Sequence, residues 1–305
     1  MCDMTAYIVY NGFWNAVPPD PVQRLHTALQ QHNVPSCMVP NTALTACFSD
    51  SVRILQVDGT ALTTDDFLLF WDKDTRLAFS AESAGLRVYN TAASIARCDD
   101  KSETHRVLAA AGIPMPETLV APMTYVDVTK PIESFLDTAQ KVLGYPMVLK
   151  ECYGSFGNQV FLANNREELK NLAYAREARP FLVQRFIREA AGEDRRLYVV
   201  GDRVVAAMKR QSQTDFRANL GQGGTSQAYV PTKEETELAI RCCRLLGLQF
   251  GGVDLLISQN GPLVCEVNSN AHMAGLIACT GVDVADEIVK EVLRREAERK
   301  NVWSN

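Results

Sequence analysis

Apolar and polar positions alternate along the first ninety residues in two patterns, one typical of strands and one of helices. Strand-like runs occur at Thr5–Tyr10, Val52–Val57, Phe67–Trp71 and Arg87–Tyr89. Amphipathic, helix-like spacing occurs at Pro21–Gln31 and Thr75–Ala84. Phe67–Trp71 is apolar throughout, as expected of a strand buried on both faces of a parallel sheet. These patterns predict an open α/β domain.

The pattern changes from Asp99 onward, where helices and strands follow in a mixed order. Helices are predicted at Lys101–Ala111, Ile132–Leu143, Arg166–Arg176, Lys233–Leu246 and from Asp283 to about Arg299. Strands are predicted at Met147–Lys150, Gln159–Leu162 and Phe181–Gln184. Two hairpins are predicted, one turning at Gly201-Asp202 and one at Asn260-Gly261. We find no repeat or flexible linker, so we expect the modules to pack into one unit.

Composition excludes several classes of protein. The 305 residues carry 31 Lys+Arg and 36 Asp+Glu, a formal charge of −5, which argues against binding nucleic acid by long-range attraction. No apolar run approaches the roughly 20 residues of a membrane span, and the first residues do not have the pattern of a signal peptide. The nine cysteines are scattered without a CxxC pair, which fits a reducing compartment. We therefore expect a cytoplasmic protein that binds neither nucleic acid nor membrane.

The second predicted hairpin carries three oxygen donors. Glu266 and Asn268 are two residues apart, so their side chains leave the same face of their strand, and Asp254 on the partner strand can meet them. Such a set suits a hard cation, Mg²⁺ or Mn²⁺, that keeps positions for water and phosphate. The alternative is a sheet with one polar, solvent-facing side.

Two lysines and a glycine-bearing loop suggest a polyphosphate site. Lys150 ends an apolar strand, and Gly154–Asn158 follows it with glycines that free backbone N–H groups to face phosphate. Lys101 lies in the first turn of a helix, where an anionic ligand would offset its unfavourable interaction with the helix dipole. The alternatives are an ordinary hairpin turn and a lysine neutralised by the preceding aspartates.

Two further segments can contact a nucleotide. Gln184–Ile187 continues an apolar strand as an extended connector, which offers backbone donors and acceptors to an adenine edge. An acidic residue beyond it can accept hydrogen bonds from ribose hydroxyls. In Asp215–Gly224, Arg217 and Asn219 lie on a glycine-containing loop, where arginine presents a planar fork of donors to phosphate. Each segment alone is also compatible with a surface loop.

Taken in order, these features resemble the ATP-grasp ligases, and within them the RimK type. The resemblance rests on Gly192-x-Asp194-x-Arg196, Asp215-Phe216-Arg217-Ala218-Asn219, Gly252-Val253-Asp254 and Glu266-Val267-Asn268, and it covers about residues 90–295. It implies a pre-ATP-grasp α/β domain over residues 1–98, a central ATP-grasp subdomain with the phosphate-covering loop over 99–184, and a C-terminal subdomain with the metal hairpin over 185–305. Both subdomains are expected to be α+β.

The resemblance also implies a role for each matching residue. Arg217 and Lys150 are implied as catalytic, and Asp254, Glu266 and Asn268 as Mg²⁺ ligands. The implied ATP-binding residues are Lys101, Lys150, Gly154, Ser155, Gly157, Gln184, Arg185, Phe186, Ile187, Asp194, Arg217, Ala218 and Asn219. Of the four histidines, only His272 lies in a candidate site.

The implied reaction joins a carboxylate to an amine. ATP phosphorylates the carboxylate, and the amine displaces phosphate from the acyl phosphate, which requires positioning and charge neutralisation rather than a nucleophilic triad. Glutamate or another amino acid is the implied substrate, added to a peptide, protein or small molecule. Two departures from the family pattern leave the substrate open. Glutamate-adding enzymes often carry a basic residue where this chain has Gln222, and the segment after Asn268 lacks a proline-containing turn that is common in relatives. A D-alanine–D-alanine-type ligase, a carboxylate kinase, a non-catalytic ATP sensor and a homo-oligomer also stay open.

Overall fold

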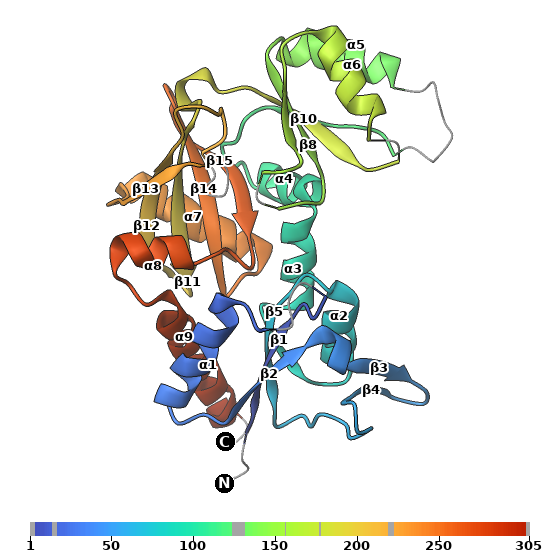
Figure 1. Cartoon of the computed structure of the whole chain (residues 1–305), viewed down its shortest axis with the longest axis vertical. Helices are drawn as coiled ribbons and strands as arrows, with labels where there is room; N and C mark the ends of the chain where they lie inside the picture. The colour runs from blue at the N-terminus through green and yellow to red at the C-terminus, as the bar shows by residue number, and fades with distance from the viewer. Residues whose placement is uncertain are drawn as a thin grey trace.

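The N-terminal domain is built on a parallel sheet. The computed structural model describes residues 4–13, 17–123, 132–155, 157–176, 178–218 and 223–302 (Figure 1). The sheet has the order β2-β1-β5-β6, and its strands are β1 (Ala6–Tyr10), β2 (Ser36–Pro40), β5 (Phe67–Trp71) and β6 (Arg87–Tyr89). Helices α1 (Asp20–Gln31), α2 (Thr75–Ser83) and α3 (Ala92–Asp99) accompany it. All five residues of β5 are buried, as its apolar run predicted.

Two strands of this domain differ from the prediction. The run at Val52–Val57 forms only β4 (Val52–Leu55), which pairs with β3 (Thr45–Phe48) in a separate antiparallel hairpin. The fourth strand of the main sheet is instead β2, whose residues are half-buried or exposed and end in proline. A strand at a sheet edge tolerates proline and exposure, so it lacks the apolar signal of a central strand.

The central unit is a four-stranded antiparallel sheet with two helices. The strands β7 (Thr118–Val120), β8 (Met147–Glu151), β9 (Val160–Ala163) and β10 (Phe181–Arg185) have the order β7-β10-β8-β9. Helices α5 (Glu133–Leu143) and α6 (Arg166–Tyr174) bury their apolar faces in one cluster with β8 and β10, at the top of Figure 1. This is the α+β arrangement that the sequence predicted.

The C-terminal unit is a five-stranded antiparallel sheet in the order β13-β12-β11-β14-β15. Its strands are β11 (Glu193–Val200), β12 (Arg203–Gln211), β13 (Thr225–Ala228), β14 (Phe250–Ser258) and β15 (Gly261–Asn268). Helices α7 (Lys233–Leu246), α8 (Ala274–Thr280) and α9 (Val284–Val302) complete it. Thr232 and Glu235 form a capping box at the start of α7, and Gly247 ends the helix in the left-handed conformation (φ 80°). Both predicted hairpins are present.

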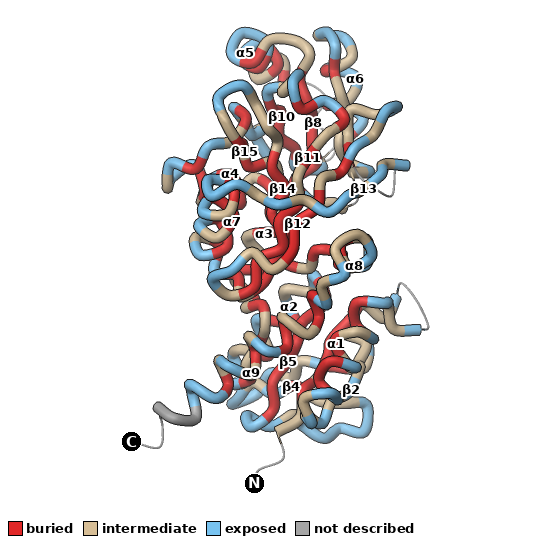
Figure 2. The backbone as a smooth tube through the Cα atoms, turned by 90° about the vertical axis from the view of Figure 1, so that its left-hand side faces the viewer, coloured by how far each residue is buried: buried red, intermediate tan, exposed pale blue. Residues whose placement is uncertain are grey.

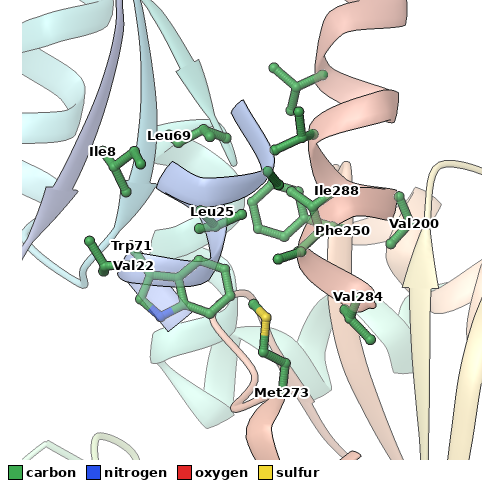
Figure 3. Close-up of a cluster of buried hydrophobic side chains, with 14 of the residues drawn as sticks. Ile8, Val22, Leu25, Leu69, Trp71, Val200, Phe250, Met273, Val284 and Ile288 are labelled. Atoms are coloured by element: carbon green, nitrogen blue, oxygen red, sulfur yellow. The ribbon is translucent and has the colours of Figure 1, made fainter. Parts of the chain in front are cut away.

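Two parts of the chain pack outside the unit to which sequence order assigns them. Helix α9 lies beside α1, so one buried cluster joins residues of the N-terminal domain, such as Leu25 and Trp71, to Phe250, Val284 and Ile288 (Figure 3). Helix α4 (Lys101–Ala110) packs in the core of the C-terminal sheet. The buried backbone consequently runs almost continuously from the N-terminal domain into the C-terminal sheet (Figure 2). The domain boundaries at 98 and 184 stay a prediction.

Within the described residues, none of the helices combines the length and the apolar character that a membrane span requires. The eight cysteines in that part of the chain are free thiols.

Candidate active site

A cleft of about 860 Å³, open solvent included, lies between the central and C-terminal sheets. It is lined from one side by β8, the loop after it and β10, and from the other by β11, β12, β14 and β15. Every described residue that was implied as catalytic, ATP-binding or metal-binding lines this cleft except Asn268, and His272 does not line it either. Asn219 and Gln222 lie outside the described residues. The cleft therefore brings together side chains that are up to 165 positions apart in the chain, from Lys101 to Glu266.

The two predicted nucleotide lysines are buried and point into the same region. Lys101 Nζ donates to the Gly154 carbonyl oxygen at 3.2 Å and lies 3.5 Å from Glu266 Oε1. Lys150 Nζ donates to Cys265 Sγ at 3.5 Å. Only 9% of Lys101 and 6% of Lys150 is exposed. A buried ammonium with so few strong acceptors is poised for an anionic ligand.

The loop after β8 is held in place by side chains from two distant segments of the chain. Lys73 of the N-terminal domain donates to Ser155 Oγ at 3.2 Å, and Arg217 Nη1 donates to the Gly157 carbonyl at 2.6 Å. Gly154 has a backbone conformation (φ +146°) that other residues rarely adopt, and a Cβ there would lie 2.5 Å from Gln159 Oε1, so the Gln159 side chain would have to move. Phe156, which the sequence suggested as a cover for phosphates, lies outside the described residues.

The connector after β10 contributes its backbone to the cleft. Gln184 is buried, and its Nε2 donates to Thr118 Oγ1 at 2.9 Å. The Arg185 guanidinium turns away from a nucleotide position, because it pairs with Glu117 at 2.5 Å and donates to the carbonyls of Val142 and Leu143. The Arg185 backbone N–H donates to the Glu117 carbonyl oxygen at 2.8 Å, so it is not available to a ligand. Arg185 can therefore serve an adenine edge only through its own carbonyl oxygen.

Four buried charges form a compact network on the floor of the cleft. Arg210 binds both oxygens of Asp194 at 2.6 and 2.7 Å, and Arg196 binds both oxygens of Asp254 at 2.7 Å. Arg210 also reaches Asp254 Oδ2 at 3.0 Å, so the network is continuous and neutral. Burial alone would raise the pKa of Asp254, but the two guanidinium groups outweigh it and lower this pKa to about 2.

The register of the C-terminal sheet places the predicted metal ligands. Asp254 lies directly opposite Glu266 across β14 and β15, and Arg196 lies opposite Asp254 on β11. Asn268 pairs with Gly252, and its Nδ2 is buried without a hydrogen-bond partner in the described residues. Glu266 is the accessible carboxylate, with 29% of its side chain exposed. Two adjacent carboxylates repel each other unless a cation lies nearby.

Magnesium fits this donor set in part. Glu266 and Asn268 offer the hard oxygen ligands that Mg²⁺ prefers, with space for water and phosphate. Asp254 uses its oxygens on Arg196 and Arg210, so it can bind a cation only with its remaining lone pairs or after the arginines shift. Among the described residues, no group of three or more His, Cys, Asp or Glu side chains is arranged to hold a metal by itself. The protein ligands would thus be completed by a bound nucleotide.

Arg217 is more constrained than its loop position suggested. Its Nε and Nη2 bind the Asp215 carboxylate at 3.0 and 2.7 Å, and its Nη1 donates to the carbonyls of Gly157 and Val160 at 2.6 and 3.3 Å. The adjacent Ala218 is buried and also lines the cleft. The guanidinium thus links the two walls of the cleft through the loop after β8.

Sequence reasoning missed several residues that shape the site. Arg210 and Arg196 form the charge network, and Lys73 reaches in from the N-terminal domain. Among the histidines, His105 also belongs to this region: burial, and then Lys150 and Lys101, lower its pKa to about 3. The i, i+4 spacing of Lys101 and His105 on one helix face was the available signal for this neighbour.

Comparison with known proteins agrees with the geometry. The chain matches the RimK-like ATP-grasp domain over residues 98–292. A probable alpha-L-glutamate ligase of Trichodesmium erythraeum is 41% identical over 212 residues, which are 68% of each chain. The protein belongs to the RimK-like ATP-grasp family. A second probable alpha-L-glutamate ligase, from Hahella chejuensis, is 38% identical over 222 residues, 72% of this chain and 71% of the relative.

Solved structures share the fold at lower identity. An ATP-grasp RimK domain protein of Sphaerobacter thermophilus superposes with a TM-score of 0.70 at 23% identity, covering 94% of this chain and 98% of its own. The ATP-grasp ligase PsnB, complexed with a phosphomimetic precursor variant, Mg and ADP, gives 0.67 at 18% identity, covering 96% and 99%. A D-alanine–D-alanine ligase of Bacillus anthracis gives 0.68 at 15% identity, covering 97% and 99%. These structures confirm the predicted ATP-grasp fold. The family match and the relatives confirm the ligase class, and ATP is the nucleotide that the family uses.

Proposed function

We propose that this protein is a magnesium- and ATP-dependent carboxylate–amine ligase that adds L-glutamate, or another amino acid, to a peptide, protein or small molecule. The observation that supports it most is the convergence of Lys101, Lys150 and Arg217 with Asp254 and Glu266 in one cleft. A phosphoryl transfer needs this combination of cations for phosphate and carboxylates for a metal.

The proposed reaction has two balanced steps. A carboxylate oxygen of the acceptor attacks the γ-phosphorus of ATP, the bond to the bridging oxygen breaks, and ADP leaves. The amine nitrogen then attacks the acyl carbon, inorganic phosphate leaves with the former carboxylate oxygen, and the nitrogen loses a proton. When bound, Mg²⁺ would neutralise charge on the phosphates and orient them.

The chain's own residues would hold the nucleotide. Lys101 and Lys150 bind phosphates, and Gly154, Ser155 and Gly157 cover them. The Arg185 carbonyl, Phe186 and Ile187 contact adenine, with Gln184 supporting the connector and Asp194 facing ribose. Arg217, with Ala218 and Asn219, stabilises the transferred phosphoryl group, and the metal is bound by Glu266, Asn268 and Asp254.

The substrate class is inferred from the relatives. Those named alpha-L-glutamate ligases are about 40% identical to this chain, which favours L-glutamate as the amino acid. The oxygen donors also fit Mn²⁺ as a substitute for Mg²⁺. The free thiols support a reducing location, the cytoplasm.

An ADP-release screen tests the proposal. The purified protein is incubated with Mg-ATP, L-glutamate and a panel of peptides ending in a free carboxylate, with the Glu266→Ala variant as control. We expect ADP release that requires both substrates, and a product heavier by one glutamate residue. Release with a carboxylate alone would indicate a carboxylate kinase, and ligation of D-alanine in place of L-glutamate would indicate a D-alanine–D-alanine-type ligase. ATP binding without any release would indicate a sensor.

A further inference from the structure

A group of polar residues lies where the central strands of the N-terminal sheet end. In the order β2-β1-β5-β6, the chain continues from β1 to β2 on one side of the sheet and from β5 to β6 on the other. The strand order therefore reverses between β1 and β5. Ligands of open parallel sheets bind outside the carboxyl ends of the strands at such a point. Here Asn11 directly follows β1, and Asp72 directly follows β5.

Asp72 is a buried carboxylate that pairs with no cation among the described residues. Only 8% of it is exposed, and no Lys, Arg or His nitrogen of the described residues lies within 4.0 Å of its oxygens. Its contacts are the Lys73 backbone N–H at 2.6 Å and Asn11 Nδ2 at 3.4 Å from both oxygens. The neighbouring Lys73 ammonium is engaged elsewhere, with Asp99 Oδ1 at 2.6 Å. Burial raises the pKa of Asp72, as expected for a carboxylate that lacks compensation.

Asn270 supplies a buried acceptor that has no donor among the described residues. Its Nδ2 donates to the Asp72 backbone carbonyl at 2.9 Å, which fixes the orientation of the amide. The amide oxygen Oδ1 is then buried without a hydrogen-bond partner in the described part of the chain. Buried polar atoms are nearly always satisfied and buried charges are nearly always paired, so this oxygen and the uncompensated Asp72 carboxylate need an explanation.

This position adjoins the reacting end of the proposed nucleotide site. Lys73, next to Asp72, donates to Ser155 Oγ in the phosphate-covering loop at 3.2 Å. Asn270 follows the proposed metal ligand Asn268 by two residues. Asp72 is therefore next in sequence to a residue that contacts the loop expected over the phosphates, and Asn270 lies just past the end of the metal hairpin.

We propose that Asp72, Asn270 and Asn11 bind the α-ammonium group of the amino-acid substrate. This rests on the proposed function, since it names part of the substrate site of that reaction. An ammonium group carries three N–H donors and one positive charge. These match a buried carboxylate that lacks a cation and an amide oxygen that lacks a donor among the described residues.

Binding measurements test the assignment without relying on turnover. Titration calorimetry is done with Mg²⁺ and a non-hydrolysable ATP analogue present, first with L-glutamate and with glutarate, which lacks the ammonium group. The other amino acids follow, each with its deamino analogue. The variants are Asp72→Asn and Asn270→Ala, and the control is Asp65→Asn, an exposed acid just before the opposite end of β5. Thermal unfolding confirms that each variant is folded.

The assignment predicts that the wild type binds the amino acid more tightly than its deamino analogue by about 10- to 100-fold, the usual effect of a charged hydrogen bond. In Asp72→Asn this difference should nearly vanish, in Asn270→Ala it should shrink, and in Asp65→Asn it should persist. Unchanged discrimination in a folded Asp72→Asn variant overturns the assignment, as does a wild type that binds no amino acid of the panel. Either result leaves the proposed function intact if Mg-nucleotide binding and ADP release persist, whereas loss of those would refute the proposed function itself.

Discussion

Replacing Asp254 and Glu266 separately by alanine should separate folding from catalysis. Both are proposed to bind the same metal, so both variants should lose turnover. The structure gives them different roles in stability. Asp254 is buried and binds two arginines, whereas Glu266 is partly exposed and, among the described residues, forms an ion pair only with Lys101.

The expected magnitudes follow from these contacts. Asp254→Ala leaves Arg196 without its carboxylate partner in a buried site, and removing one member of a buried pair costs about 3–5 kcal/mol. Glu266→Ala loses a contact of 3.5 Å at a side chain that is 29% exposed, for which about 0–1 kcal/mol is expected. The low pKa of Asp254, about 2, means that its contribution is present at neutral pH and is lost as the pH falls from about 4 through 2.

Denaturant unfolding at pH 7 and at pH 3, together with ADP release, measures both effects. The exposed Glu237→Ala variant on α7 serves as control and should behave as wild type in both assays. The gap in unfolding free energy between wild type and Asp254→Ala should narrow at the lower pH. Equal stability of the Asp254→Ala and Glu266→Ala variants at pH 7 would refute the role given to the arginine network. Wild-type turnover in a folded Glu266→Ala variant would refute the metal assignment.

Three further predictions follow from the same contacts. Arg217→Lys should keep most of the ATP affinity and lose about 10²–10³ in turnover number, because lysine cannot bind Asp215 and the Gly157 carbonyl at the same time. Steady-state kinetics that show equal losses of ATP affinity and of turnover number would contradict this. Hydrogen exchange of residues 154–158 should slow on adding Mg-ATP, since the loop is expected to close over phosphates, and equal exchange in both states would leave only a structural turn. His105→Gln should lose less stability than the wild type as the pH falls from 7 to 5. In the unfolded chain His105 binds a proton below about pH 6.5, whereas in the folded chain, with a pKa of about 3, it does not; parallel profiles of unfolding free energy against pH would refute this.

The local pattern of the sequence was sufficient for most helices and central strands. The continuous apolar run of β5 and the alternation in the two C-terminal hairpins are set by burial, which the residue types report directly. Strand β2 was missed because it lies at a sheet edge and is only partly buried. Helix α3 was missed because its eight residues are too few to show the helical repeat of apolar positions. The pairing of β4 with β3 depends on distant contacts that no local pattern records.

The site was predictable as a set of residues but less so as a set of contacts. Side chains alternate between the two faces of a strand, which predicted that Glu266 and Asn268 share one face of β15. The observed register puts Asp254 opposite Glu266. That Arg196 and Arg210 use the oxygens of Asp254 depends on the register of three strands at once. The direction of the Arg185 side chain likewise depends on the end of α5, about forty positions away in the chain.

The central claim is that a carboxylate is activated as an acyl phosphate, and an oxygen-transfer experiment tests it most directly. The acceptor identified by the ADP-release screen is labelled with ¹⁸O in its carboxylate, and the inorganic phosphate released with Mg-ATP and L-glutamate is analysed by mass spectrometry. Direct attack of the carboxylate on ATP predicts one ¹⁸O atom in each released phosphate. Released phosphate without label, formed at the same rate as the amide product, would contradict the account.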